Sequence, residues 1–130
     1  MDPVLFHNNE EGRQAFVDLA SRAVLWIADY YRNIENYPVR SQVLPGDIYK
    51  QFPAQFPAQP VTDDEVFRIL QEVIIPGMTH WQHPGFYAFF PGNTSFPSIV
   101  AEMVTAGMSA QCMLWESSPA AAELEQRCME

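Results

Sequence analysis

Basic residues are scarce in this sequence, and lysine is almost absent. Seven Lys and Arg residues stand against sixteen Asp and Glu residues, which gives a net charge of −9 over 130 residues. Lys50 is the single lysine. Proteins that bind nucleic acid need a basic patch along the phosphate backbone, and anionic membranes attract the same kind of patch. We therefore expect a protein that binds neither nucleic acid nor membranes.

Long apolar runs and cysteine clusters are also missing. No stretch reaches the roughly 18 uninterrupted apolar residues of a transmembrane helix, and the first residues lack the pattern of a secretory signal. The two cysteines, Cys112 and Cys128, form no Cys-x-x-Cys pair and are too few for a disulfide framework. These features predict a cytoplasmic protein with reduced thiols.

The sequence has enough apolar residues for a core, at 48%, and they first recur with helical spacing. The first predicted helix follows a cap at Asn8, with Glu11 three residues later, and ends near Asn36 and Pro38. Its apolar positions are Phe16, Leu19, Ala20, Ala23, Val24, Ile27, Tyr31 and Ile34. Such a long amphipathic helix needs a surface against its apolar stripe, and the rest of the chain offers little.

A proline-rich connector follows at residues 37–61. Its five prolines disfavour both helix and central strand, so we expect an extended strap whose residues Phe52 and Phe56 pack on a neighbouring surface. A second helix begins at Thr62, where Glu65 completes a capping box, and stops at Pro76-Gly77.

Two more helices are predicted in the last third of the chain. One runs from about Ser95 to Met108, and the other opens at Ser118-Pro119 with serine as the cap and proline at the first helical position. The last helix shows no stop signal before Glu130. We therefore expect the chain to be a piece of a longer protein.

Residues 77–97, called the aromatic loop from here on, are irregular and rich in rings. The rings belong to Trp81, Phe86, Tyr87, Phe89, Phe90 and Phe96. A loop of this kind can form a pocket for a flat apolar group with one polar end, and burial of the rings in a core or interface is the alternative. His80 and His83 lack the cysteines or carboxylates of a metal site, so we interpret them as polar residues of a packed loop.

The aromatic loop and the residues after it resemble a known family. Residues 76–84, Pro-Gly-Met-Thr-His-Trp-Gln-His-Pro, are similar to the Pro-Gly-x-Thr-His-Trp-x-x-Pro segment of aromatic-L-amino-acid decarboxylases. Residues 86–91, 94–98, 115–120 and 122–125 continue the match in order. The chain thus resembles the N-terminal portion of a group II decarboxylase that depends on pyridoxal phosphate.

The resemblance implies a fold and an activity. The expected fold is mainly α, with three to four helices, a Pro-rich strap and the aromatic loop, as the N-terminal segment of a fold-type I enzyme. Residues 1–36 would form a dimer-clasp helix, 37–61 the connector, 62–115 a helix, the substrate loop and a helix, and 116–130 the start of the large cofactor domain. The full-length homodimer would decarboxylate L-amino acids, commonly aromatic ones, to amines and CO₂.

The resemblance also implies site residues. The side-chain pocket of the substrate would be lined by Trp81, Phe89, Phe90, Pro91 and Gly92. Gln111 and Met113 would reach the partner's active site across the dimer. Many animal members of the family have Tyr-Phe-Pro-Thr where this chain has Phe-Phe-Pro-Gly at residues 89–92, so two hydroxyl groups are missing here. Both plain decarboxylation and oxidative decarboxylation with deamination remain open.

The cofactor's lysine is not expected in this chain. Pyridoxal phosphate acts as the electron sink for decarboxylation and is held by a lysine, which lies much later in the family's sequence. Lys50 lies in the connector, far from that motif, so no catalytic, cofactor-binding or metal residue is predicted and the chain alone is expected to be inactive. The alternative is a non-catalytic chain that acts as a helical binding or dimerisation module.

Overall fold

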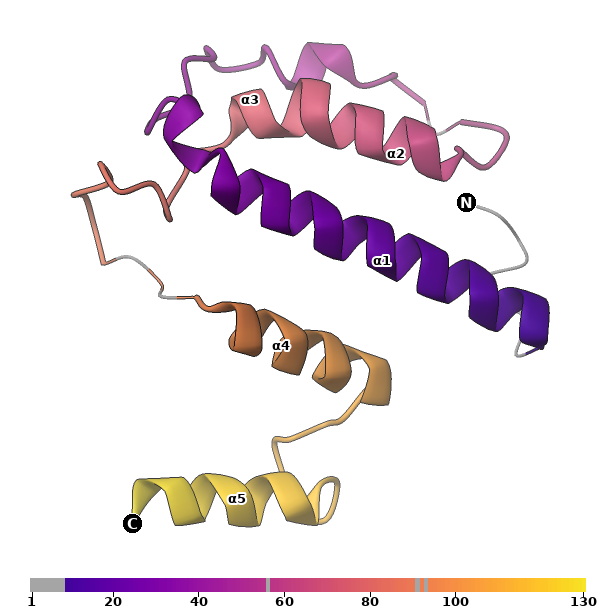
Figure 1. Cartoon of the computed structure of the whole chain (residues 1–130), viewed down its shortest axis with the longest axis vertical. Coiled ribbons are helices and arrows are strands. Elements are labelled where there is room, and N and C mark those ends of the chain that lie inside the picture. Colours follow the sequence, from indigo (N-terminus) through magenta and orange to yellow (C-terminus); the bar gives the residue numbers. More distant parts are fainter. Residues whose placement is uncertain (1–8, 56, 91, 93) are drawn as a thin grey trace. The chain divides into compact units, whose positions relative to one another are not determined.

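The computed structural model describes residues 9–55, 57–90, 92 and 94–130 (Figure 1). These residues are helical or irregular and contain no β-strand, which confirms the predicted mainly α fold. They belong to two compact units, one up to residue 91 and one from residue 92 on. Within the described part of the chain, no helix combines the length and apolar character needed to cross a membrane.

Helix α1 (Glu10–Arg32) begins one residue later than the sequence suggested. Its cap is Asn9, which has an extended backbone and whose side chain accepts a hydrogen bond from the Gly12 N–H at 2.8 Å. The predicted cap at Asn8, outside the described residues, is therefore wrong, and Glu11 does not complete a capping box. Two adjacent asparagines are equally good caps, so local sequence could not choose between them. A short 3₁₀ turn, Ile34–Asn36, follows the helix.

The second helical run is confirmed, although it is not a uniform α-helix. It consists of α2 (Asp63–Ile69), a π-helical turn (Leu70–Ile74) and α3 (Ile75–Gly77). The Ile75 N–H donates to the carbonyl of Leu70, five residues back, just before a proline that has no N–H to donate. A π-turn of this kind is rare and widens the helix locally.

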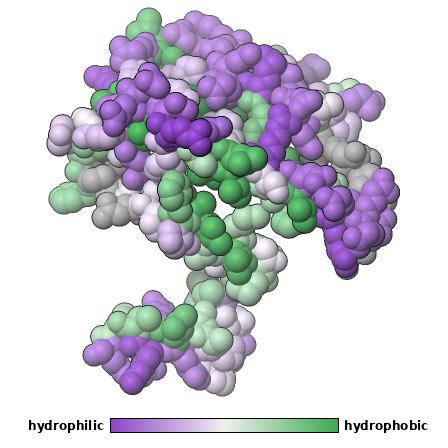
Figure 2. Space-filling view, viewed as in Figure 1, coloured by the Kyte–Doolittle hydropathy of each residue, from purple (hydrophilic) through white to green (hydrophobic). Residues whose placement is uncertain are grey.

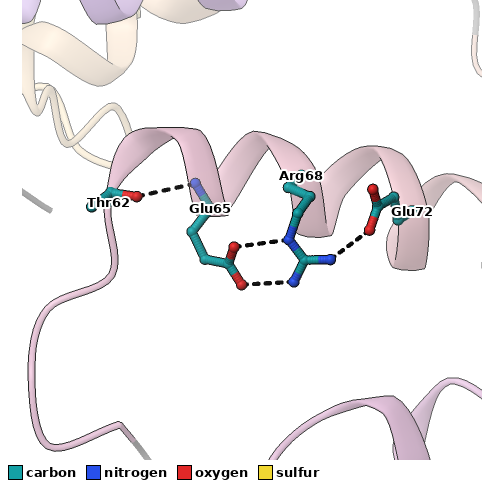
Figure 3. A network of polar contacts seen from close by, with 4 residues as sticks. All are labelled: Thr62, Glu65, Arg68 and Glu72. Carbon is teal, nitrogen blue, oxygen red and sulfur yellow. Dashed lines mark hydrogen bonds and ion pairs between the residues drawn. The ribbon is translucent and has the colours of Figure 1, made fainter.

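Half of the capping box predicted at the start of α2 is present. The Thr62 hydroxyl accepts a hydrogen bond from the Glu65 N–H at 3.2 Å. The Glu65 carboxylate does not return to Thr62, because it accepts two hydrogen bonds from Arg68, which also pairs with Glu72 (Figure 3). The hydrogen bonds from Arg68 hold the pKa of Glu65 below its usual value.

Helix α1 and the run α2–α3 lie side by side and point the same way (Figure 1). Arg22 forms an ion pair with Asp64 and its guanidinium lies 4.2 Å from the centre of the Phe67 ring. Further along, the Trp26 indole N–H donates to Gln71 at 3.3 Å. Because the two helices are parallel, the chain must return along their whole length before α2 begins, which explains the long connector.

The connector packs against the start of the aromatic loop. The Val39 carbonyl accepts from the His80 N–H at 3.0 Å, and the Ser41 hydroxyl donates to the Pro76 carbonyl at 3.0 Å. The Ile48 side chain lies so close to Gly77 that a Cβ there would approach it to 2.9 Å. Among the described residues, these contacts hold the strap by its first half. Phe52 is exposed, and Phe56 lies outside the described residues.

The buried side chains of the described residues lie in the first unit. The apolar ones are Ile34, Val73 and Ile75, and His80 joins them with an exposed fraction of 2%. The predicted apolar stripe of α1 only partly faces inward, because Phe16 and Val24 are exposed. The side of α1 that meets α2 carries Arg22 and Trp26, which are not among the apolar positions predicted from the sequence.

The second unit contains α4 (Phe96–Met108) and α5 (Pro119–Met129). The Ser95 and Ser98 side chains form a reciprocal capping box at the start of α4, and Ser109 ends it with a left-handed backbone. Ser118 and Pro119 stand at the predicted cap and first position of α5. Most large apolar side chains of α4 are exposed, whereas Ile99 is half-buried. Figure 2 shows apolar surface, in green, in one view of the molecule.

Candidate functional site

Three rings gather in the part of the aromatic loop that precedes residue 91. The Trp81 ring lies 5.0 Å from the Phe86 ring and 5.9 Å from the Phe89 ring, measured between centroids. The Phe89 ring is nearly parallel to the indole, with 24° between the planes. Trp81 is 43% exposed and Phe89 is 82% exposed, so the cluster is open to solvent on one side. An open cluster of rings can receive another flat ring.

The backbone of Phe89 is in the left-handed region, with φ of 58°. For a side chain with a bulky ring this conformation costs about 1 kcal/mol, and strained residues of this kind cluster at functional sites. Stacking of the Phe89 ring on Trp81 offsets part of that cost. The next ring, Phe90, is 99% exposed.

His80 anchors the same loop on its buried side. Its Nδ1 lies 2.8 Å from the Tyr30 hydroxyl of α1, and its ring stacks on the Tyr37 ring with 4.8 Å between centroids. Burial is the main cause that lowers the pKa of His80, and His83 lowers it further. Burial likewise raises the pKa of Tyr30. Burial thus disfavours the charged form of both groups, and the Tyr30 hydroxyl and the imidazole share one hydrogen bond through Nδ1.

His83 serves the turn of the loop. Its Nδ1 accepts a hydrogen bond from the Gly85 N–H at 2.8 Å. Gly85 has little room for a side chain, because a Cβ would lie 3.1 Å from that nitrogen and 3.3 Å from Val39. Both histidines thus have side-chain partners, His83 within the loop and His80 on α1, which agrees with their interpretation as polar residues of a packed loop. In the described residues no three His, Cys, Asp or Glu side chains come close enough to hold a metal ion.

The structure brings together only two of the residues predicted to line the pocket, Trp81 and Phe89. Phe90 is in the same unit and points into solvent, and Pro91 lies outside the described residues. Gly92, the last of the five, belongs to the second unit and is exposed there, as are Gln111 and Met113, which were predicted to reach the partner's active site. Among the described residues, no atom lies within 4 Å of where a Cβ on Gly92 would be. The assignment of these residues to a substrate pocket stays a prediction.

The residues that sequence reasoning missed are Tyr30 and Tyr37. Tyr30 lies four residues after Trp26, and their rings stack with 5.7 Å between centroids and 9° between planes. That helical spacing of two rings was the available signal. The contact of both tyrosines with His80 could not be read from the sequence, because 50 residues separate Tyr30 from His80.

An open hollow of about 570 Å³ lies elsewhere, in the second unit. Its lining includes Trp115, whose indole N–H donates to Glu123 at 3.1 Å, and the ion pair of Arg127 with Glu130. Its single cationic side chain is thus already paired with a carboxylate, and none of the predicted site residues lines it. We therefore place the candidate site at the aromatic loop.

The described residues do not fit pyridoxal phosphate by themselves. The amine of Lys50 is exposed in the connector and lies 3.8 Å from the Asp47 carboxylate. A lysine that holds this cofactor must reach into a pocket that also has donors for a phosphate group. Neither feature surrounds Lys50, so we assign no cofactor contact to it.

Comparison with known proteins shows the family to which the chain belongs. Residues 45–130 match the family described as the pyridoxal-dependent decarboxylase conserved domain. The aromatic-L-amino-acid decarboxylase of Catharanthus roseus is 44% identical over 117 residues, which are 90% of this chain and 23% of that protein. The phenylacetaldehyde synthase of Arabidopsis thaliana is 46% identical over 100 residues, which are 77% of this chain and 20% of that protein.

A solved structure gives the same result. The tryptophan decarboxylase of Catharanthus roseus in complex with L-tryptophan matches with a TM-score of 0.83 and 43% identity, over 92% of this chain and 25% of that one. The chain therefore spans about a quarter of the length of the relatives it matches. With its helices, its ring-rich loop and its matched residues taken together, this chain belongs to the pyridoxal-dependent decarboxylase family.

Proposed function

We propose that this chain is the N-terminal segment of an enzyme that decarboxylates aromatic L-amino acids to amines and CO₂. The observation that carries the proposal is the open ring cluster of Trp81, Phe86 and Phe89. Ring pairs favour centroid separations of about 4.5–7 Å in stacked or tilted arrangements. A substrate ring placed beside this cluster makes the same kind of contact, so the loop favours aromatic over aliphatic side chains.

Pyridoxal phosphate supplies the electron sink for the reaction, and we assign its lysine and phosphate contacts to parts of the enzyme outside these residues. The contribution of this segment is binding. Its rings orient the flat end of the substrate and keep water from that end. The four residues Phe89 to Gly92 carry no side-chain hydroxyl, so recognition here rests on ring contact and not on a hydrogen bond to a phenol.

We further propose that the enzyme is a homodimer in which α1 packs against the partner subunit. Successive residues of an α-helix are about 100° apart, which places Arg22, Trp26 and Tyr30 on one side of α1. That side contacts α2 and the aromatic loop. Two exposed apolar residues, Val17 and Val24, lie on the opposite side of α1, and the exposed residues Phe16 and Leu25 lie at its two flanks. A helix with two apolar sides needs two neighbours.

The dimer is tested by adding a charge to the exposed side of α1. Leu25→Glu in the full-length protein is expected to shift the mass measured by light scattering from dimer toward monomer. Gln59→Glu adds the same charge at an exposed position of the connector and is expected to leave the dimer intact. A dimer that is insensitive to Leu25→Glu would remove α1 from the interface.

We also propose a cytoplasmic location. The acidic balance of the chain and its two exposed, unpaired cysteines suit a reducing compartment. Fractionation of cells that express the full-length protein, with an antibody against this segment, tests the location, and a signal in the secreted or membrane fraction would contradict it.

The activity is tested on the product of the complete reading frame. Purified with pyridoxal phosphate, it is expected to release CO₂ and an amine from tryptophan, tyrosine or phenylalanine, and to leave alanine and glutamate unchanged. Release of an aldehyde in place of the amine would indicate oxidative decarboxylation with deamination.

The second candidate function is a helical binding module without chemistry of its own. The exposed side of α1 favours it as well, because that side suits dimerisation whether or not a cofactor domain follows. If the gene product ends near residue 130 and binds a full-length decarboxylase subunit without releasing CO₂ itself, this second function is correct.

A further inference from the structure

We propose that Tyr30 and Tyr37 act through His80 as positioning residues that fix Trp81 in the orientation needed to receive the substrate ring. The inference rests on the proposed function, because it concerns how the ring cluster is held in place. Tyr30, Tyr37 and His80 do not line the open side of the cluster. Their role is to hold the backbone from which the Trp81 ring extends.

His80 makes more contacts than an exposed loop residue would. His80 is the most deeply buried side chain in the described part of the protein, at 2% exposed. Its Nδ1 is bonded to Tyr30, its ring stacks on Tyr37, and its backbone N–H donates to the carbonyl of Val39. Contacts from α1 and from the connector therefore meet at one residue of the aromatic loop. A histidine held from three directions cannot turn without breaking a hydrogen bond or a ring stack.

Trp81 is the next residue along the chain, so the contacts of His80 also restrict the backbone of Trp81. Its own N–H donates to the Thr79 carbonyl at 3.1 Å, and the His83 N–H donates to the His80 carbonyl at 2.9 Å. The backbone on both sides of Trp81 is thus tied to the residues around His80. The Trp81 ring then meets Phe86 and Phe89 on the open side. A shift of His80 would move the ring that the other two pack against.

Tyr30 is itself held firmly enough to serve as a support. Its ring stacks on Trp26, one helical turn earlier, and the Trp26 indole donates to Gln71 in the π-turn. The Tyr30 hydroxyl lies 2.8 Å from Nδ1 of His80, so the phenol and the imidazole share one hydrogen bond. This hydrogen bond and the ring stacking favour the same arrangement, in which helix α1 and the loop are joined.

The test removes that hydrogen bond and keeps the ring. Tyr30→Phe in the full-length enzyme is expected to raise KM for the aromatic substrate by about three- to tenfold, the range that one net hydrogen bond supports. The same variant is expected to leave kcat within about twofold, because only the placement of the substrate's ring is affected. Tyr49→Phe removes a hydroxyl from an exposed tyrosine of the connector and is the matched control, with both constants expected to stay at the parent values.

A second measurement does not depend on activity. Amide hydrogen exchange of residues 81–90 is expected to rise by about three- to tenfold in Tyr30→Phe, with no change in α5. The double variant Tyr30→Phe with His80→Phe removes both partners and retains two flat rings. It is expected to exchange more slowly than Tyr30→Phe alone, because no buried nitrogen is left unpaired.

The two readouts separate this inference from the proposed function. If the unmodified protein shows no decarboxylation but exchange in residues 81–90 rises in Tyr30→Phe, the positioning role stands and the proposed function is wrong. If the protein is an active decarboxylase and Tyr30→Phe changes neither KM nor exchange in the loop, the positioning role is wrong. A fall in kcat with an unchanged KM would also overturn it, since that pattern belongs to a residue that acts on the reacting atoms.

Discussion

The two units of this chain differ in how their apolar residues are used. In the first unit, two parallel helices, the connector and the start of the aromatic loop share contacts that bury Ile34, Val73, Ile75 and His80. Among the described residues of the second unit, none is buried, and α4 exposes Val100, Met103, Val104 and Met108. The first unit therefore has a small core of its own. The second unit has a well-capped helix, α4, whose apolar side chains are mostly exposed, and a helix α5 whose cap residue Ser118 makes no side-chain hydrogen bond.

The strongest test of this difference is a buried charge. Val73→Asp in the 130-residue chain is expected to lower the free energy of unfolding of the first unit by about 3 kcal/mol or more, because a carboxylate would replace a buried apolar group. Val104→Asp is the matched change on the exposed side of α4. It is expected to change the free energy of unfolding by about 0.5 kcal/mol or less. Urea unfolding followed by circular dichroism measures both. Equal losses would mean that the second unit has a core as well.

The next largest effect concerns binding by the two units. In the full-length enzyme, Trp81→Ala is expected to raise KM for an aromatic substrate by about 10- to 100-fold through loss of the ring cluster. Trp115→Ala, in the second unit, is expected to leave that KM within about threefold, because its indole is engaged with Glu123. Steady-state kinetics on both variants decide the question, and a larger effect at Trp115 would move the site to the second unit.

Acid should weaken the first unit before the second. The folded-state pKa of His80 is lower than that of the unfolded chain, so its contribution to stability is complete above the unfolded pKa of about 6.5 and is lost as pH falls through the folded value. Tyr30, Tyr37 and His83 are the titratable groups that face it. We expect the melting temperature of the first unit to fall below pH 6.5 in the parent and to be flatter with pH in His80→Phe. A parallel fall in both proteins would contradict this.

Removal of a helix cap should have a smaller effect, which differs between α2 in the first unit and α4 in the second. Thr62→Ala and Ser95→Ala each remove a side-chain acceptor at a helix start, which costs about 1 kcal/mol. Helix α2 packs against α1, so it is expected to stay helical in the 130-residue chain. Helix α4 lacks such support among the described residues, so Ser95→Ala is expected to reduce helicity over residues 96–108. Carbon chemical shifts from NMR report the helicity of each segment, and equal losses in α2 and α4 would erase the distinction.

The smallest effect is expected on the surface of the first unit. Arg68→Gln removes the ion pairs with Glu65 and Glu72, which are exposed (Figure 3). Exposed pairs of this kind contribute little to stability and are screened by salt. The loss should therefore be measurable at low salt and negligible in 1 M NaCl. A loss that persists at high salt would show that Arg68 also supports packing.

Local signals in the sequence were sufficient for most helix boundaries. Thr62, Ser95 and the Ser118-Pro119 pair each stand at the predicted helix starts, because a cap depends on residues within one turn. The cap of α1 was misplaced by one residue, since Asn8 and Asn9 have the same chemistry. The family and its cofactor followed from motifs in and after the aromatic loop.

Long-range features could not be read from the sequence. The side of α1 that meets α2 is set by Arg22, Trp26 and Tyr30, whose partners lie more than 40 residues away. The π-turn before Pro76 and the left-handed backbone of Phe89 arise from packing, and no local residue preference announces them. The ring-rich composition of residues 77–97 indicated where the ring cluster lies. Only the structure showed that Tyr30 and Tyr37 contact His80 next to it.

The parallel course of α1 and α2 has a consequence for the integrity of the chain. The stretch that joins them is exposed over residues 53–55 and 57–60, whereas the contacts between the helices come from side chains on either side of it. A protease site inserted there would sever the covalent link without touching those contacts. The two fragments would then stay associated through those contacts, and the cleaved protein would remain folded.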